Sequence, residues 1–405
     1  MLPWRNGGKM VFDYNRSTLN MMSSILGNFG GKSPHLSLPA LDELTREPYD
    51  HVILMVFDGM GQSFVERYAR ELNLPPKMQN IPLKTVFPPT TAAAMTSLYT
   101  GDSPREHGYL GWSLWFEEFE DRYINILPGT ESGKNRAYFG EPRDIYDIMP
   151  LHPFSQKLRD VQPDLPLYFI TPKAFKESRY TKAACGPAKM VPYRRFKDMT
   201  RAAAASVKKN SSGRSYTMVY NVDPDKFLHP EGVDTLRLRD FMTLLGEQLR
   251  KLISRIEGSN TLLLVTADHG MTGMEDYYKM KEGEELFSLL KRPPFPESRM
   301  LSFHVKEGDK ERFRKRFHEL LGEDFTLIEG EAFIREGWLG PDVVGGQSHG
   351  RLDKLIGDYM AVAKGRKGIK YEAKEGGKSS PLFKAHHAGM TREEMDVPLL
   401  VYSAR

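Results

Sequence analysis

The chain has 405 residues, of which 40% are hydrophobic and 27% are charged, and its formal net charge is +4. This composition is ordinary for a folded protein, and the charge is too small to indicate a nucleic-acid polymer as a partner. No apolar run reaches the ~18 residues of a membrane-spanning helix, so no membrane partner is expected. The length suits one large α/β domain with an inserted lobe, or about two to three average domains.

The N-terminus and the cysteine content bear on the compartment. Arg5 and Lys9 are basic, but no apolar stretch of a secretory signal follows them. Cys185 is the only cysteine, so it is expected to be structural, and no internal disulfide can form. Both features are typical of a reducing compartment, and we expect a cytoplasmic protein.

In chain order, five apolar runs predict the strands of a sheet. The first, at residues 51–57, is almost continuously apolar and ends at Asp58, as in a central parallel strand covered on both faces. Helical periodicity fills the intervals between the runs, so we expect a doubly wound, mostly parallel sheet with helices on both faces. The other four runs are residues 167–171, 216–220, 261–265 and 397–402.

Start and stop signals predict two helices. One begins at Thr91, after two prolines, and stops before Gly101; the other spans residues 234–256 with apolar residues at helical spacing. Residues 208–215 predict a polar surface turn. The Gly- and Lys-rich stretch 364–380 predicts a loop, either solvated or a flexible basic flap over an anionic substrate.

A β-α-β pattern in the last third of the chain predicts a small inserted α+β lobe. Its elements are a strand at 300–305, a helix at 309–321 and a strand at 325–328. We therefore expect a catalytic core made of residues 1–272 and 346–405, interrupted by a lobe at 273–345.

Acidic and imidazole side chains follow several predicted strands. Asp58 follows the first strand and the Asp268-His269 pair follows the fourth, at the sheet edge where open α/β folds place their chemistry. Gly270 gives the backbone the freedom to turn there. Asp225 and His229 lie four residues apart, which puts both on one face of a helical turn, as metal sites require.

His387 precedes the last strand and completes this set, although the adjacent His386 leaves open which imidazole would bind. Mixed carboxylate and imidazole ligands suit zinc or manganese better than magnesium. Two such ions about 4 Å apart can hold the attacking and leaving oxygens of a displacement at phosphorus.

A hydroxyl nucleophile is predicted at the start of the helix that begins at Thr91. Backbone N–H groups and the helix dipole favour a phosphoryl oxyanion and an alkoxide at this place. A bound metal would lower the pKa of the hydroxyl further. The helix position does not separate Thr90 from Thr91, and N-capping is the other interpretation of this pair.

Taken together, these motifs resemble the alkaline phosphatase superfamily, and within it the type I phosphodiesterase/nucleotide pyrophosphatase family. The resemblance covers roughly residues 50–112, 216–272 and 385–403. Its motifs are Val56-Phe-Asp58-Gly-Met-Gly61, Phe87-Pro-Pro-Thr-Thr-Ala-Ala-Ala-Met-Thr-Ser-Leu-Tyr-Thr-Gly101, His107-Gly-Tyr-Leu-Gly-Trp112, Thr266-Ala-Asp-His-Gly-Met271 and the segment that begins at His387-Ala-Gly-Met-Thr391.

The resemblance implies an alkaline-phosphatase-like fold and two divalent metal ions, zinc first and manganese as the alternative. It implies a nucleophile, Thr91, that is transiently phosphorylated or nucleotidylated and then released by water in a double displacement. The substrate would be a small phosphate ester or a nucleotide. One implied metal site consists of Asp58, Thr91, Asp268 and His269, and the other of Asp225, His229 and His387.

The sequence also departs from the family. Relatives usually carry an asparagine after the motif at 107–112, where this chain has Gly111-Trp-Ser-Leu-Trp115, so diester and nucleotide preference stay open. Trp112, Trp115 and Phe116 either stack on a base or pack in the interior. Ala388 stands where relatives often have glycine, which matters only if its φ is positive.

Other activities follow from the same superfamily. A phosphomonoesterase is the first alternative, followed by a phosphonate hydrolase or a phosphosugar mutase, and an inactive metal-binding protein is the last. A sulfatase is disfavoured because the chain lacks the Cys/Ser-x-Pro-x-Arg motif.

Overall fold

The structure is a computed structural model that describes residues 5–6, 9–10, 14–132, 145–341, 348–372 and 382–405. Its main feature is a seven-stranded mixed sheet with β3 (His51–Phe57) at the centre. Five strands are parallel, β22 runs antiparallel to β12, and β4 pairs antiparallel with β22 at one edge. On one side of β3, from the centre outward, lie β11 (Ser215–Asn221), β9 (Leu167–Pro172) and β10 (Lys189–Tyr193). On the other side lie β12 (Thr261–Thr266), β22 (Leu399–Ala404) and β4 (Gln79–Asn80).

All five predicted strands belong to this sheet, and the predicted α/β class is confirmed. The strands β3, β11 and β12 are buried at every position, which explains their nearly continuous apolar sequences. The last run is divided at Pro398, which has no N–H to donate. Its first part, β21 (Asp396–Val397), pairs with β5 (Leu83–Lys84) instead of joining the large sheet.

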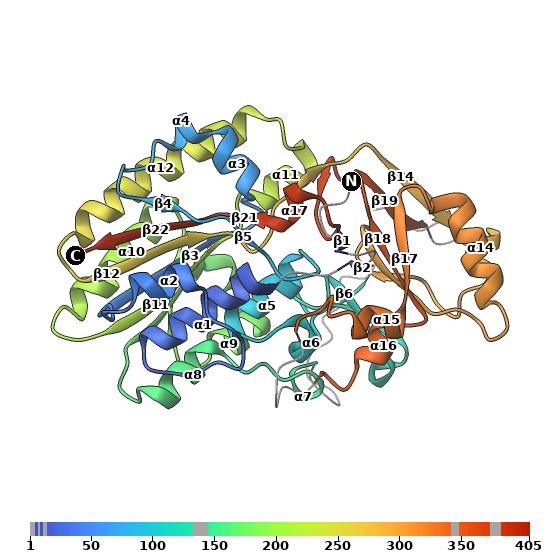
Figure 1. Ribbon diagram of the computed structural model, residues 1–405, viewed down its shortest axis with the longest axis horizontal. Helices are drawn as coiled ribbons and strands as arrows, with labels where there is room; N and C mark the ends of the chain where they lie inside the picture. The colour runs from blue at the N-terminus through green and yellow to red at the C-terminus, as the bar shows by residue number, and fades with distance from the viewer. Residues whose placement is uncertain (1–4, 7–8, 11–13, 133–144, 342–347, 373–381) are drawn as a thin grey trace.

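Helices cover both faces of the sheet (Figure 1). On one face, α12 (Leu236–Ile256) packs against α10 (Phe196–Lys209) and α4 (Ala69–Leu72). On the other, α5 (Thr91–Thr100) contacts α1 (Thr18–Asn28), α8 (Phe154–Val161) and α9 (Arg179–Cys185). The two predicted helices are therefore present, and the predicted polar turn occupies residues 210–214 between α10 and β11.

A second, smaller unit of sheet and helix carries its own apolar core. Its antiparallel sheet has the order β15-β16-β18-β17, and α14 (Lys310–Leu321) packs Phe313 and Phe317 against Phe303. The predicted strands at 300–305 and 325–328 and the helix between them are confirmed. The strands are β15 (Phe295–Pro296), β16 (Met300–Phe303), β17 (Phe325–Glu329) and β18 (Tyr359–Ala363).

Two strands of this lobe come from residues that we assigned to the core by sequence. The strand β18 pairs with β16 and β17, and β19 (Lys367–Glu372) pairs with β14 (Asp276–Lys281). The division of the chain into 1–272, 273–345 and 346–405 stays a prediction. The predicted loop at 364–380 is wrong for residues 367–372, because β14 supplies a partner that the local sequence does not reveal. Residues 373–381 lie outside the described residues.

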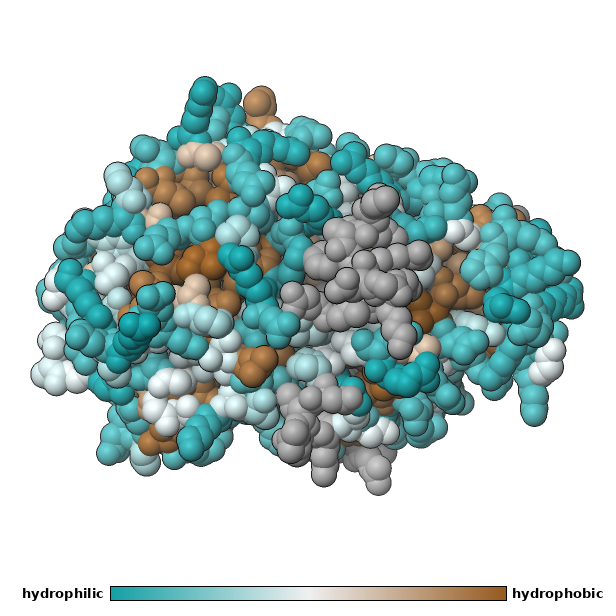
Figure 2. Space-filling view, viewed as in Figure 1, coloured by the Kyte–Doolittle hydropathy of each residue, from teal (hydrophilic) through white to brown (hydrophobic). Residues whose placement is uncertain are grey.

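Hydrophilic residues dominate the face of the molecule shown in Figure 2, and hydrophobic residues appear there as separate areas. Among the residues that the structure describes, no helix is both long and apolar enough to cross a bilayer.

Candidate active site

The seven residues singled out by sequence meet at the carboxyl ends of the central strands. Asp58 follows β3, the pair Asp268-His269 follows β12, and Thr91 is the first residue of α5. Asp225 and His229 lie in α11 (Asp225–Glu231), which follows β11, and His387 follows β20 (Ala385–His386). The parallel sheet therefore assembles the site from segments far apart in the sequence.

Asp58, Asp268 and His269 form what we call the deep cluster. The Nε2 atom of His269 lies 3.4 Å from Asp58 Oδ1 and 3.4 Å from Asp268 Oδ2. Asp268 and His269 are fully buried, and Asp58 is 3% exposed. The Oδ2 atom of Asp268 has no hydrogen-bond partner, whereas its Oδ1 accepts bonds from the backbone N–H groups of Gly59 and His269.

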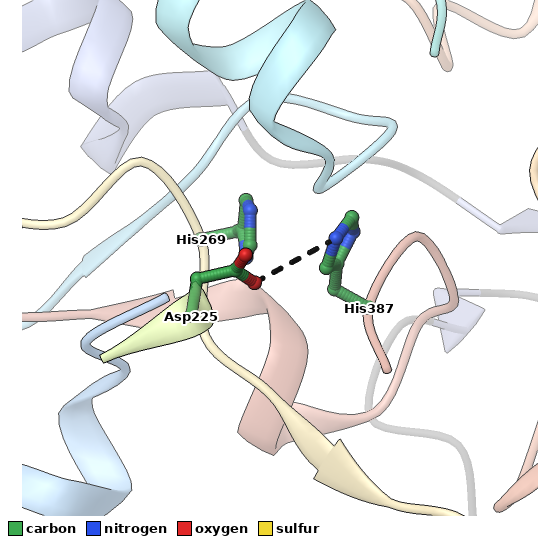
Figure 3. Close-up of side chains that lie close together, drawn as sticks. All are labelled: Asp225, His269 and His387. Carbon is green, nitrogen blue, oxygen red and sulfur yellow. Dashed lines mark ion pairs between the residues drawn. The ribbon is translucent and has the colours of Figure 1, made fainter. Parts of the chain in front are cut away.

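Asp225, His229 and His387 form a second group, the rim cluster. The Oδ1 atom of Asp225 lies 3.3 Å from His229 Nε2 and 3.8 Å from His387 Nε2. This carboxylate oxygen also lacks a hydrogen-bond partner. Figure 3 shows Asp225 and His387 converging beside His269, and ligand atoms of these three residues lie within 4.8 Å of one another. His269 therefore borders both clusters.

The three histidines share one hydrogen-bonding arrangement. The Nδ1 atom of each donates to a backbone carbonyl oxygen: His229 to Ala385, His269 to Gly270 and His387 to Pro89. Such a bond fixes the tautomer and leaves Nε2 with a free lone pair, as metal-binding histidines require. All three Nε2 atoms face the carboxylates of the clusters.

The electrostatics of the deep cluster favour a cation. Burial raises the pKa of Asp58 well above its usual value, and the neighbouring Asp268 and Asp225 carboxylates raise it further. Burial also raises the pKa of Asp268 to about 7. Buried carboxylates at this spacing repel one another, and a divalent ion between them would remove the repulsion and satisfy the orphaned oxygens. Both donor sets therefore fit a metal ion.

In the rim cluster, one acid and one imidazole stabilise each other. Burial lowers the pKa of His229, but the Asp225 carboxylate outweighs this effect and raises it to about 9. For Asp225, burial raises the pKa, while the charged His229 lowers it to a net value below the usual range. Without a metal, His229 is therefore protonated at Nε2 as well as at Nδ1, and a metal ion bound there would displace the Nε2 proton.

The structure separates the two threonines at the start of α5. The Oγ1 atom of Thr91 lies 3.3 Å from Asp58 Oδ1 and 3.1 Å from His269 Nε2, so it faces the deep cluster. Thr90 is the N-cap residue, yet its side chain does not cap the helix and instead donates to Glu297 Oε1 at 2.8 Å.

The two adjacent histidines are separated in the same way. The Nε2 atom of His386 bonds to Ser298 Oγ at 2.8 Å, and its Nδ1 accepts the backbone N–H of His387. Both ring nitrogens of His386 are therefore engaged, one by Ser298 and the other by the backbone of His387.

The sequence profile described as type I phosphodiesterase/nucleotide pyrophosphatase matches residues 52–389. The chain belongs to this family. It is thus a member of the alkaline phosphatase superfamily and of a family of phosphoric ester hydrolases, as its motifs predicted. None of the curated proteins gives a significant match.

Solved structures share the fold at low sequence identity. Murine ectonucleotide pyrophosphatase/phosphodiesterase 5, an inactive threonine-to-alanine variant in complex with AMP, has a TM-score of 0.59 and 16% identity, covering 87% of this chain and 88% of that chain. Its human counterpart has a TM-score of 0.59 and 16% identity, covering 87% of both chains. Phosphonoacetate hydrolase from Sinorhizobium meliloti, in complex with phosphonoformate, has a TM-score of 0.57 and 15% identity, covering 87% and 90%.

One position of this family member has an unusual backbone. Ala388, where relatives often carry glycine, has a φ of 82°. An alanine in this region is strained, and its N–H is held by Pro89 O at 2.9 Å. This strained residue directly follows His387 of the rim cluster.

A large cavity opens onto the site, and it distinguishes Trp112 from the two other aromatic residues of this region, Trp115 and Phe116. Its volume is about 2030 Å³, and Asp58, Thr91 and Asp225 line it. Trp112 is 46% exposed and also lines this cavity, where a base or an aromatic leaving group could stack. Trp115 and Phe116 are buried and pack in the interior.

Two residues that bond to residues of the site were not identified from the sequence. Tyr220, near the end of β11, donates its hydroxyl to Asp58 Oδ2, and its place at a strand end was a signal that could have revealed it. Glu297 lies between β15 and β16, and its Oε1 accepts bonds from Thr90 Oγ1 and from the N–H of Trp112. No motif marks Glu297, because only the folding of the lobe brings it to the site.

Proposed function

We propose that the chain is a two-metal hydrolase of phosphate esters that acts as a phosphodiesterase or nucleotide pyrophosphatase, with Thr91 as its nucleophile. The observation that carries this proposal is the place of the Thr91 hydroxyl. It stands at the start of α5 and within 3.3 Å of Asp58 and 3.1 Å of His269. Membership of a phosphoric ester hydrolase family supports the reaction class.

One metal ion would be held by Asp58, Thr91, Asp268 and His269, and the other by Asp225, His229 and His387. The mixed oxygen and nitrogen donors favour zinc, with manganese as the alternative. When bound, these ions would lower the pKa of the nucleophile and neutralise the charge that develops on the phosphoryl oxygens. The Nδ1 bonds of the histidines keep each Nε2 aimed at the ion.

The chain itself supplies the nucleophile and an environment for the phosphoryl group. The Thr91 hydroxyl loses its proton as the Oγ1–phosphorus bond forms and the bond to the leaving-group oxygen breaks. Water then displaces Thr91 from phosphorus, and Oγ1 regains a proton as the water loses one. The N-terminus of α5 faces the same place, where its free N–H groups favour phosphoryl oxygens. Tyr220 holds Asp58 in position through its hydroxyl.

The substrate in this proposal is a small phosphate ester or a nucleotide. The murine relative of the same fold was solved with AMP, which supports a nucleotide ligand for this chain. The cavity is large enough for a nucleotide, and aromatic side chains line it together with Thr91, among them Trp112 and Tyr123.

The test is hydrolysis of three esters by metal-stripped protein reconstituted separately with zinc and manganese. The substrates are bis-p-nitrophenyl phosphate, p-nitrophenyl phosphate and the p-nitrophenyl ester of thymidine monophosphate. We expect faster turnover of the two diesters. Monoester preference would indicate a phosphatase, and no metal-dependent turnover of any ester would refute the proposal.

The nucleophile is tested with a matched pair of variants. We expect Thr91→Ala to lower turnover on the order of a thousandfold or more while metal binding persists. Thr90→Ala should keep the reaction, because the Thr90 hydroxyl faces Glu297 instead of the deep cluster. Normal turnover in Thr91→Ala would refute the assignment.

A further inference from the structure

Glu297 places an acidic side chain of the lobe next to the predicted nucleophile. It lines the same cavity as Thr90 and Thr91, and its Oε1 lies 2.8 Å from Thr90 Oγ1. Because Thr90 directly precedes Thr91, this carboxylate lines the cavity in which Thr91 would receive a phosphoryl group. An anionic substrate would therefore meet a negative charge there.

The position of this carboxylate is fixed from two directions. Oε1 accepts the Thr90 hydroxyl and, at 2.6 Å, the backbone N–H of Trp112. The next two residues are anchored as well: Ser298 bonds to His386, and the fully buried Arg299 makes two bonds to Glu394. Two donors bond to the same oxygen, so the Glu297 carboxylate is held in one position as a hydrogen-bond acceptor.

Besides the proposed metal ions, the cavity holds few cationic groups. Apart from histidines, the cationic side chains that line the cavity in the described part of the chain are Lys226, Lys281 and Lys370, and no arginine lines it. A guanidinium would be the usual bidentate partner for the extra oxygens of a phosphomonoester. In this chain the charged side chain that bonds to Thr90 is an acid instead.

We propose that Glu297 is a specificity-determining residue that makes the site select phosphodiesters over phosphomonoesters. This inference rests on the proposed function. A monoester carries up to two negative charges near neutral pH, since its second pKa is about 6, whereas a diester carries one. The carboxylate, when ionised, repels the additional charge, and the repulsion is stronger than in water because the side chain is partly buried. A diester places a neutral ester oxygen where the monoester has this charge.

The decisive variant is Glu297→Gln, which removes the charge and keeps an oxygen that can accept from Thr90 and Trp112. We would measure kcat/KM at pH 8 for bis-p-nitrophenyl phosphate and p-nitrophenyl phosphate, which share a leaving group. The diester-to-monoester ratio should fall at least about tenfold, mainly through faster monoester hydrolysis. Glu297→Asp, which keeps the charge, should retain the preference. Glu285→Gln, which removes a charge on the lobe surface beside Arg312, should leave the ratio unchanged.

A binding measurement separates selection from structural support. In a Thr91→Ala background, Glu297→Gln should tighten the binding of phenyl phosphate relative to diphenyl phosphate, as measured by calorimetry. An unchanged ratio in both experiments, or an equal loss for both substrates, would overturn the proposal, because Glu297 would then only position Thr90. A wild type that hydrolyses neither ester would instead overturn the proposed function, and the specificity proposal with it.

Discussion

The deep and rim clusters differ in how the fold supports them. Asp58, Asp268 and His269 follow the two central strands β3 and β12, and they are almost entirely buried. In the rim cluster, Asp225 and His229 lie on the short helix α11, and His387 lies in the segment after β20. The deep cluster thus depends on the sheet, whereas the rim cluster depends on a helix and on a segment that the lobe holds.

The lobe contributes to the rim cluster through residues close to His387. Arg299, at the start of β16, bonds to Glu394, and Glu394 accepts the backbone N–H groups of Gly389 and Thr391. Ser298 holds His386. Because of this difference, the two proposed metal ions need not respond alike to changes in sequence, in pH or in the lobe.

Removal of a ligand should have the largest effect, and it should differ between the clusters. Asp268→Ala should lower turnover by more than about 100-fold and reduce the bound metal from two equivalents to one, because water cannot easily replace a fully buried ligand. His229→Ala, at the more open rim, should be partly rescued by added imidazole. Metal content and turnover, measured with and without imidazole, check both. Equal rescue of the two variants would contradict the difference between the clusters.

Loss of the ion pair between Arg299 and Glu394 should destabilise the fold, and it should lower the metal affinity of the rim cluster but not that of the deep cluster. Arg299→Met leaves the Glu394 carboxylate buried without its partner, which should cost about 3–5 kcal/mol of unfolding free energy. Arg299→Met with Glu394→Met should recover part of this loss. Arg312→Met, which breaks an exposed pair with Glu285, is the control and should cost less than about 1 kcal/mol. Denaturant unfolding and zinc titration test this prediction, and equal weakening of both metal sites would contradict it.

The pH dependence of metal binding should separate the clusters further. Metal binding requires deprotonated ligands, so affinity rises with pH until each ligand has lost its proton. The pKa of His229 is raised to about 9, and that of Asp268 is raised to about 7. We therefore expect the affinity of the rim cluster to increase up to about pH 9, whereas the contribution of Asp268 ends near pH 7. Asp58, whose pKa burial also raises, adds its own pH dependence to the deep cluster. Chelator-buffered zinc titrations between pH 6 and 9.5 measure this. In His229→Gln, the dependence between pH 7 and 9 should disappear.

The smallest effect is expected at the strained residue beside His387. Ala388→Gly relieves a positive φ but increases the entropy of the unfolded chain, so the net gain in unfolding free energy should be below about 1 kcal/mol. Ala385→Gly, at a buried position in β20, is the control and should destabilise the protein. Thermal unfolding of both variants measures these changes. A clear loss of stability in Ala388→Gly would contradict the prediction that the backbone of Ala388 is strained.

The sequence predicted the sheet well, and it singled out seven residues that the structure brings together, because each signal is local. An apolar run that ends in Asp58 or Asp268-His269 identifies both the strand and the side chain at its end. The preference for Thr91 over Thr90 and for His387 over His386 came from the family resemblance alone, since the helix start and the paired imidazoles did not separate them. In the structure, Thr90 donates to Glu297 and His386 bonds to Ser298, so these two side chains are engaged elsewhere.

Other features depended on contacts that no local pattern encodes. The strand β19 forms because β14 lies beside it, although its own sequence is rich in glycine and lysine. Glu297 reaches Thr90 across 207 positions of the chain, and only the packing of the lobe brings them together. Tyr220 could have been found as a polar group near a strand end.

The most direct test of the two-metal site is a crystal structure of the zinc-loaded protein with anomalous data at the zinc absorption edge. We expect two anomalous peaks, one bounded by Asp58, Thr91, Asp268 and His269, and one bounded by Asp225, His229 and His387. A single peak shared by both clusters, or no peak next to Thr91, would contradict the two-metal account.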